Sequence, residues 1–211
     1  ESGVHIGLYA KRSIRVVNTA ECPIQQPLIN EILAWHHDFF ASVHEAFTDE
    51  NWPVDHLVIR QIGEGLMVAL VSKSDSCSFL DRWVSELSEN YPSASLLLNL
   101  NSNPGNVILG PETRSLFGPS EQPLTVGDCR YHVRLDTFFQ SNTLQTETLF
   151  KQVLAAAHLT GTERVADLYC GVGAITLQLA AHAKQVVGIE SVASSIDAAK
   201  KNADLNNLTN V

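Results

Sequence analysis

The chain has 211 residues, enough for one large hydrophobic core or two smaller ones. Hydrophobic residues make up 45% of it and charged residues 18%, as in ordinary globular proteins, and no apolar run approaches the roughly 20 residues that cross a bilayer. The formal net charge of −9 argues against unspecific binding of nucleic acid over a broad surface, although a local basic patch remains compatible with it.

Four cysteines lie far apart in the sequence, with no Cys-x-x-Cys pair: Cys22, Cys77, Cys129 and Cys170. This spacing is typical of reduced thiols and not of a disulfide framework or a self-contained zinc site. The opening residues ESGVHIGLYA contain no basic region followed by an apolar stretch, so we expect no signal peptide. These features predict a cytoplasmic protein without membrane contact, and the sequence indicates no protein partner.

The first part of the chain predicts strand pairs with helices between them. In chain order we expect a hairpin over 4–18, a helix from Pro27, a hairpin over 55–74, a helix over 77–90 capped by Ser76 or Ser78, strands over 93–101 and 106–118, and a hairpin over 124–136. Such a mixture is typical of an α+β domain, which we place at residues 1–136.

From residue 137 onward the pattern changes to alternating helices and strands. We expect a helix over 141–158, a strand over 164–170, a helix over 173–183, a strand over 185–190 and a helix over 192–207. The first helix should be capped by Ser141 or Asn142 and should bury Leu144, Thr148, Leu149, Val153 and Leu154. Strands and helices in this order predict a parallel sheet, so residues 137–211 should form the first part of a Rossmann-like α/β domain.

The stretch RVADLYCGVGAITLQLA places Gly171 and Gly173 between a strand and a helix, and the next strand ends in Glu190. At this end of a parallel sheet, glycines allow a ligand to approach the backbone, and an acidic residue can accept hydrogen bonds from ribose hydroxyls. A third glycine, usual where a pyrophosphate binds, is missing, because Ala174 follows Gly173. The pattern therefore favours S-adenosylmethionine over NAD; the simpler interpretation is a tight turn beside a solvated Glu.

The segments DTFFQSNTLQTETLF, VADLYCGVGAITLQLA and VVGIESVASSIDAAKKNADLNNLTNV together resemble the RNA uracil-C5 methyltransferase family, which makes 5-methyluridine in tRNA and 23S ribosomal RNA. The resemblance is specific from Asp136 to Val211 and looser upstream, where it implies a central, RNA-binding domain. It implies that Gln140, Tyr169 and Glu190 contact S-adenosylmethionine, and that Phe138 lines the pocket of the flipped uracil. Ordinary core packing is expected for one of Phe138 and Phe139.

The reaction of that family needs a thiolate that attacks C6 of uracil and a base that removes the proton at C5. The resemblance places both residues beyond Val211, so no catalytic residue is expected in this chain, and the chain by itself is expected to be inactive. Cys170, inside the turn, is interpreted as a small packed residue and not as the nucleophile.

Cys22-Pro23 resembles an element of the ribosomal-RNA branch in which the cysteine is the last of four ligands to a [4Fe–4S] cluster. The other three ligands would precede residue 1, and the alternative is a free buried thiol. On this element 23S ribosomal RNA is favoured over tRNA as the partner. Two other functions stay open: a methyltransferase of the same fold with another substrate, and a non-catalytic RNA-binding or assembly module with a vestigial cofactor fold.

Overall fold

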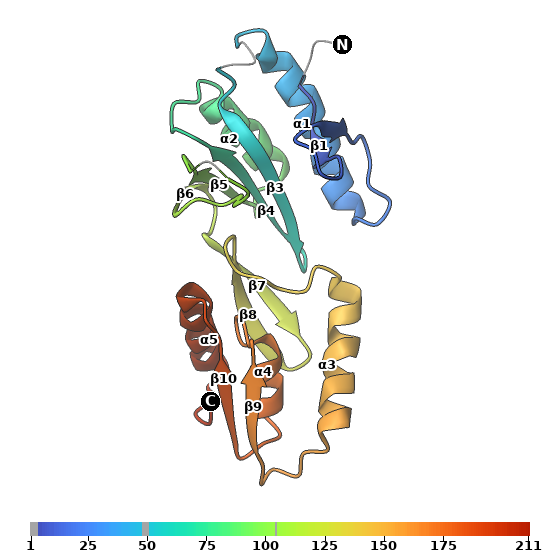
Figure 1. Cartoon of the computed structure of the whole chain (residues 1–211), viewed down its shortest axis with the longest axis vertical. Helices are drawn as coiled ribbons and strands as arrows, with labels where there is room; N and C mark the ends of the chain where they lie inside the picture. Colours follow the sequence, from blue (N-terminus) through green and yellow to red (C-terminus); the bar gives the residue numbers. More distant parts are fainter. Residues whose placement is uncertain (1–3, 48–50, 104) are drawn as a thin grey trace. The chain divides into compact units, whose positions relative to one another are not determined.

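The computed structural model describes residues 4–47, 51–103 and 105–211. The chain divides into two compact units, which Figure 1 colours along the sequence. Unit 1 comprises Glu1–Gln61 and Leu66–Pro119, and unit 2 comprises Ile62–Gly65 and Ser120–Val211. Within the described residues, no helix combines the length and the apolar character needed to span a bilayer.

Unit 1 is built on a mixed sheet whose strand order is β3-β4-β5-β6. The strands are β3 (Val54–Ile62), β4 (Gly65–Ser72), β5 (Ser95–Leu100) and β6 (Glu112–Phe117). Helix α2 (Leu80–Asn90) connects β4 to β5, which run parallel, whereas β6 pairs antiparallel with β5. The continuous apolar runs of β4 and β5 are buried on both faces, as expected for central strands.

The core of unit 1 lies between this sheet and two helices, α2 and α1 (Pro27–His44). Alternate residues of the central strands, such as Val68 and Leu98, contribute to it together with Phe39 of α1 and Trp83 of α2. Because side chains alternate across a strand and recur every three to four residues along a helix, one face of each element supplies the cluster. The remaining hairpin, β1 (Gly7–Tyr9) with β2 (Val16–Asn18), is antiparallel, which confirms the hairpin predicted over 4–18.

The prediction that Ser76 or Ser78 caps helix α2 is wrong. The helix begins at Leu80, and its N-cap residue is Phe79, which makes no side-chain capping hydrogen bond. Phe79 is buried in the core of unit 1 and stacks with other aromatic rings, such as that of Trp52. The N-cap position is therefore occupied by a buried aromatic residue and not by a serine.

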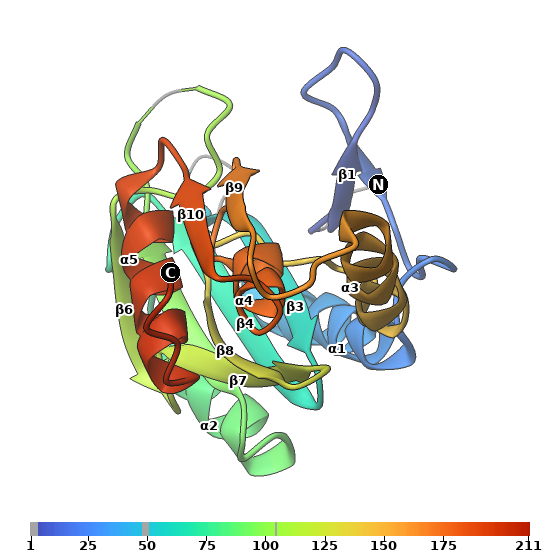
Figure 2. The same ribbon diagram turned by 90° about the horizontal axis from the view of Figure 1, so that it is seen from below.

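Unit 2 contains an antiparallel hairpin and a parallel strand pair. The hairpin is β7 (Glu121–Val126) with β8 (Cys129–Arg134), and the parallel pair is β9 (Arg164–Leu168) with β10 (Gln185–Ile189). Three helices complete the unit: α3 (Thr143–Ala157), α4 (Ala174–Ala180) and α5 (Ala193–Leu205). Figure 2 shows β9 and β10 side by side, and α4 connects them, which confirms the predicted strand-helix-strand unit.

The hairpin β7–β8 belongs to unit 2, whereas the sequence placed the end of the first domain at residue 136. Its strand β8 is bound to helices of unit 2: the Tyr131 hydroxyl donates to the Ala174 carbonyl at 2.8 Å, and the His132 N–H donates to Asn202 Oδ1, also at 2.8 Å. The sequence pattern of a hairpin shows which residues pair, but it does not show against which of the two units the hairpin packs. The structural division accordingly lies at Pro119.

Helix α3 is capped as predicted, because the Asn142 side chain accepts a hydrogen bond from the N–H of Gln145. Its predicted buried stripe is wrong in the first half of the helix, where Leu144, Thr148 and Leu149 are exposed and Thr146 and Phe150 are buried instead. Val153 and Leu154, in the second half, are half-buried against a small core that includes Leu179 and Val186. The face of α3 that packs within unit 2 is therefore not the most apolar face of the helix.

Candidate functional site

The candidate site lies where β9 and β10 end. Directly after β9, Tyr169 adopts φ +63°, followed by Gly171 at +55° and Gly173 at +79°. The N–H groups of Tyr169 and Cys170 both donate to the Ile189 carbonyl, at 2.7 and 3.1 Å, so the turn stays bound to the end of β10. Positive φ in a tyrosine is uncommon and costs on the order of 1 kcal/mol. Tyr169 is 88% exposed.

Glu190 faces this turn from the end of β10. Its Oε2 accepts a hydrogen bond from the Gly171 N–H at 3.2 Å, and its Oε1 accepts from the N–H groups of Ser191 and Val192 at 2.6 and 3.0 Å. These bonds, first those from Val192 and Ser191, lower the pKa of the Glu190 carboxyl, so it is ionised at neutral pH. Because Oε2 accepts only one of these bonds, it retains capacity for a further donor.

The two glycines of the turn are required for different reasons. A Cβ at Gly171 would meet no atom within 4 Å, so the backbone there faces open space. A Cβ at Gly173 would lie 2.7 Å from Leu177 Cδ1 and 3.3 Å from Ala199 Cβ, which shows that Gly173 allows α4 to pack closely on α5. The Gly171 backbone is therefore the part of the turn that a ligand can approach.

Two buried side chains hold the carbonyl groups of this turn and were not identified from the sequence. Asn202 of α5 donates from Nδ2 to the Val172 carbonyl at 3.2 Å, and Tyr131 of β8 donates to the Ala174 carbonyl at 2.8 Å. Polar residues on buried faces are the signal that could have found them, because a buried amide or hydroxyl needs a partner. The turn is thus held from two elements besides β9 and β10.

The segment before α3 contains the remaining predicted site residues. Phe139 is buried and contacts the Tyr131 ring edge-on with centroids 5.2 Å apart, so it is the core residue of the pair, whereas Phe138 is 72% exposed. Gln140 lines a hollow of about 320 Å³ together with side chains of α3, among them Gln145 and Gln152. No hydrogen bond among the described residues joins Gln140 to the turn at Gly171–Gly173.

Cys170 is buried beneath the turn. Desolvation, and then the negative charges of Asp167 and Glu190, raise the pKa of its thiol, so the thiolate form is disfavoured. A Cβ at Gly188 of β10 would lie 2.9 Å from its sulfur. These features agree with a small packed residue and not with a nucleophile.

Cys22 is half-buried, and its backbone is fixed by Asn30, whose side-chain amide accepts from the Cys22 N–H at 2.9 Å and donates to its carbonyl at 3.1 Å. In the part of the chain that the structure describes, no three His, Cys, Asp or Glu side chains come close enough to hold a metal ion. The residues described here therefore do not form a cluster site, and the role of Cys22 as a cluster ligand stays a prediction.

Comparison with known proteins supports the family resemblance. Residues 120–211, which lie wholly within unit 2, match the family model described as tRNA (Uracil-5-)-methyltransferase. An uncharacterized RNA methyltransferase of Oceanobacillus iheyensis is 34% identical over 99% of this chain and 47% of its own length. One of Clostridium tetani is 33% identical over 99% of this chain and 46% of its own length, so the chain spans about half the length of the curated relatives it matches.

Among solved structures, the Pyrococcus abyssi tRNA (uracil-54, C5)-methyltransferase in complex with S-adenosyl-L-homocysteine is similar, with a TM-score of 0.74 and 21% identity. The match covers 95% of this chain and 49% of that one, and it confirms the expected fold, an α+β unit followed by a Rossmann-like methyltransferase domain. Together with the family model, the motifs at Phe138–Gln140 and Asp167–Gly173 lead to one conclusion. Residues 120–211 of the chain belong to the tRNA (uracil-5-)-methyltransferase family.

Proposed function

We propose that this chain is part of an RNA methyltransferase that takes a methyl group from S-adenosylmethionine and transfers it to C5 of a uridine. The observation that carries the proposal is the position of the Glu190 carboxylate, 3.2 Å from the Gly171 N–H at the open end of the parallel strands. The names of the relatives and of the similar Pyrococcus abyssi enzyme support the RNA substrate and the cofactor class.

The residues at the turn fit S-adenosylmethionine better than a dinucleotide. Asp167 and Glu190 place two carboxylates at the turn, and after desolvation by burial their negative charges help to raise the pKa of the Cys170 thiol. Negative charge at the turn favours a cationic sulfonium and ammonium over a pyrophosphate. Gly173 lies where α4 packs on α5, and its N–H donates to the Cys170 carbonyl at 2.9 Å. This N–H is therefore not free to bind a phosphate group. When bound, the cofactor supplies the methyl group as an electrophile.

Each predicted site residue has a role in this proposal. Glu190 accepts hydrogen bonds from the ribose hydroxyls through Oε2, and the Gly171 backbone lets the cofactor approach. The exposed ring of Tyr169 lies beside the cofactor, and Gln140 contacts it from the segment before α3. Phe138, exposed in the same segment, lines the site of the flipped uracil.

The chemistry itself requires groups that this chain does not supply. A thiolate adds to C6 of the uracil, C5 takes the methyl group, and a base then removes the C5 proton so that the thiolate is eliminated. Cys170 is unsuited to the first step, because its buried thiol has a raised pKa. By the family resemblance, the nucleophile and the base lie beyond Val211.

Cofactor binding tests the proposal directly. We expect the intact protein to bind S-adenosylhomocysteine in isothermal titration calorimetry, and Glu190→Gln to weaken binding by roughly tenfold or more, since a hydrogen bond to a charged group contributes about 1.5–3 kcal/mol. Glu147→Gln, an exposed change on α3, is the matched control and should leave the affinity unchanged. Equal affinity of the wild-type protein and Glu190→Gln would contradict the assigned cofactor site.

The RNA class is tested by methyl transfer from radiolabelled S-adenosylmethionine to transcripts of 23S ribosomal RNA and of tRNA. The Cys22-Pro23 element favours the ribosomal RNA, whereas the family model and the similar structure are named for tRNA. Nuclease digestion of the labelled RNA should release 5-methyluridine. If the intact protein binds no S-adenosylhomocysteine although Gln140 and Glu190 are unchanged, the non-catalytic RNA-binding module replaces this proposal.

A further inference from the structure

The β1–β2 hairpin of unit 1 is a basic segment in an acidic chain. Residues 4–20 contain Lys11, Arg12 and Arg15 but no Asp or Glu, although the whole chain has a net charge of −9. All three basic side chains are exposed around the tip of the hairpin. None of the ion pairs found within the described ranges involves them. Their charge is therefore available to an anionic partner.

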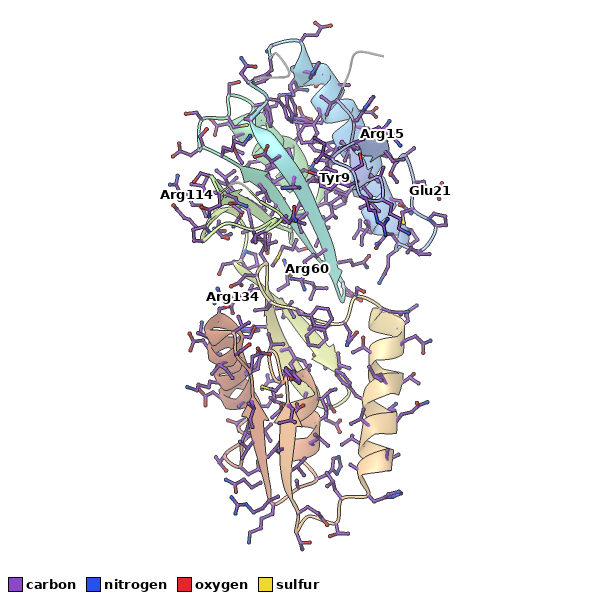
Figure 3. All side chains as sticks on the ribbon, in the orientation of Figure 1. Tyr9, Arg15, Glu21, Arg60, Arg114 and Arg134 are labelled. Atoms are coloured by element: carbon purple, nitrogen blue, oxygen red, sulfur yellow. The ribbon has the colours of Figure 1, made fainter. Side chains whose placement is uncertain are left out.

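The same hairpin exposes an aromatic ring. Tyr9, at the end of β1, is 56% exposed, and its ring meets that of His56 on β3 edge-on, with centroids 6.3 Å apart. This contact holds the ring at one edge while most of its surface stays in solvent. Figure 3 shows Tyr9 and Arg15 on this hairpin, and Figure 2 shows the loop that joins its strands projecting from unit 1.

Two hollows in unit 1 adjoin this ring, and both are lined by Tyr9, Asp55 and His56. One, of about 230 Å³, extends along β1 and β2, and the other, of about 210 Å³, extends to Lys73 and Asn101. Asp55, which lines both hollows, forms an ion pair with Lys73 Nζ at 3.4 Å. The positive charge of Lys73 therefore reduces the repulsion between the Asp55 carboxylate and a bound anion. The surface beside Tyr9 thus combines concave space with imidazole, amide and ammonium groups.

We propose that the β1–β2 hairpin is a contact site for single-stranded RNA. A base stacks on the Tyr9 ring beside the hollows, and Lys11, Arg12 and Arg15 bind the flanking phosphates. Aromatic side chains next to a basic backbone-binding segment are the usual means of binding unpaired nucleotides, since every base has a π-face and every linkage carries a charge. The inference rests on the proposed function for the chemical class of the partner, and it assigns the partner to a surface remote in sequence from the cofactor turn.

An acidic protein segment is the competing occupant. It would use the three basic side chains but would gain no base stacking from Tyr9. The exposed ring at the foot of a basic hairpin therefore favours RNA, and the contribution of Tyr9 is the feature that separates the two occupants.

The test measures binding of a fluorescein-labelled twelve-nucleotide oligouridine to the intact protein by fluorescence anisotropy at several salt concentrations. We expect the triple variant Lys11→Ala, Arg12→Ala, Arg15→Ala to bind at least tenfold more weakly, and the slope of log K against log salt to become shallower by about 2, at about 0.7 per lost phosphate contact. Tyr9→Ala should weaken binding roughly tenfold with little change in slope, as expected for loss of stacking. The matched control removes three exposed lysines of unit 2, Lys151, Lys184 and Lys200, and should change neither quantity by more than about twofold.

Two kinds of result would overturn the inference. The first is a triple variant that keeps the affinity and slope of the lysine control, or a wild-type protein that binds no oligouridine. The second is an unchanged affinity of Tyr9→Ala together with equal competition by poly-aspartate, which would identify a generic acidic partner. Calorimetry with S-adenosylhomocysteine on the same samples separates failure of this inference from failure of the proposed function, because the hairpin variants should bind the cofactor product like the wild-type protein.

Discussion

The side-chain amide of Asn202 lies between two backbone groups of unit 2: it donates to the Val172 carbonyl at 3.2 Å and accepts from the His132 N–H at 2.8 Å. It is buried, so both partners would lose their hydrogen bond in a variant without the amide. Asn202→Ala should lower the free energy of unfolding by about 2–3 kcal/mol and weaken binding of S-adenosylhomocysteine, because the turn carrying Gly171 is no longer held. Urea denaturation and calorimetry measure the two effects, with the exposed α5 variant Asp204→Ala as control; unchanged stability would contradict this role.

Gly188 of β10 and Cys170 of the turn should be energetically coupled. A Cβ at Gly188 would lie 2.9 Å from the Cys170 sulfur and 3.3 Å from its Cβ, closer than packed atoms normally approach. Gly188→Ala should therefore destabilise the protein by about 1–3 kcal/mol through overpacking. In a Cys170→Ala background the same change should cost about 1 kcal/mol less, which a double-mutant cycle of unfolding free energies measures. Additive effects would show that the sulfur does not restrict this position.

The parallel unit around the turn at Gly171–Gly173 could be predicted from local sequence. A strand, two glycines, a helix and a second strand ending in Glu190 follow one another within about thirty residues, so the topology leaves one arrangement, and the carboxylate meets the turn as expected. Even there, the pattern treats both glycines alike, whereas only Gly171 faces open space and Gly173 is required for helix packing. The spacing of glycines in the sequence shows where an unusual backbone conformation occurs, but it does not show which neighbouring atoms require a glycine there.

Features that depend on contacts distant in sequence could not be predicted. Asn202 and Tyr131 support the turn from elements 30 and 43 residues away from their partners. The hairpin containing Tyr131 lies in unit 2 through such distant contacts, which local sequence does not show. Helix α3 shows a related limit, because its most apolar face, with Leu144 and Leu149, is not the face that packs within its unit. The periodicity of apolar residues identifies an apolar face of a helix, but the tertiary contacts determine which face is buried.

His36 should make unit 1 sensitive to mild acid. The residue is buried in α1, its Nδ1 lies 2.7 Å from the Ile32 carbonyl, and its Nε2 accepts from Trp83 Nε1 at 3.0 Å, so the neutral ring is satisfied on both nitrogens. Burial lowers the pKa of His36 to about 4 from the ordinary value of 6.5, which is expected in the unfolded chain. Between these values the unfolded state binds more protons, so stability is complete above about pH 6.5 and falls as the pH decreases.

The expected loss between pH 7 and pH 5.5 is about 1 kcal/mol, measured by urea denaturation with tryptophan fluorescence, at a pH where most carboxylates remain ionised. In NMR spectra of the folded protein the His36 ring resonances should stay unchanged across this range. Titration of His36 near 6.5 in the folded protein would refute the argument.

Tyr131→Phe tests whether β8 belongs to the unit that carries the turn at Gly171–Gly173. The change removes the bond to the Ala174 carbonyl and the acceptor that Gln178 Nε2 reaches at 3.0 Å, so unit 2 should lose about 1–2 kcal/mol. Tyr91→Phe is the matched control in unit 1, where the hydroxyl donates to Glu31 at the surface, and it should cost less than about 1 kcal/mol. Hydrogen exchange resolves the two units: Tyr131→Phe should speed exchange of the amides of α4 and leave those of β4 and β5 unchanged. Faster exchange in β4 and β5 with α4 unaffected would instead assign β8 to unit 1.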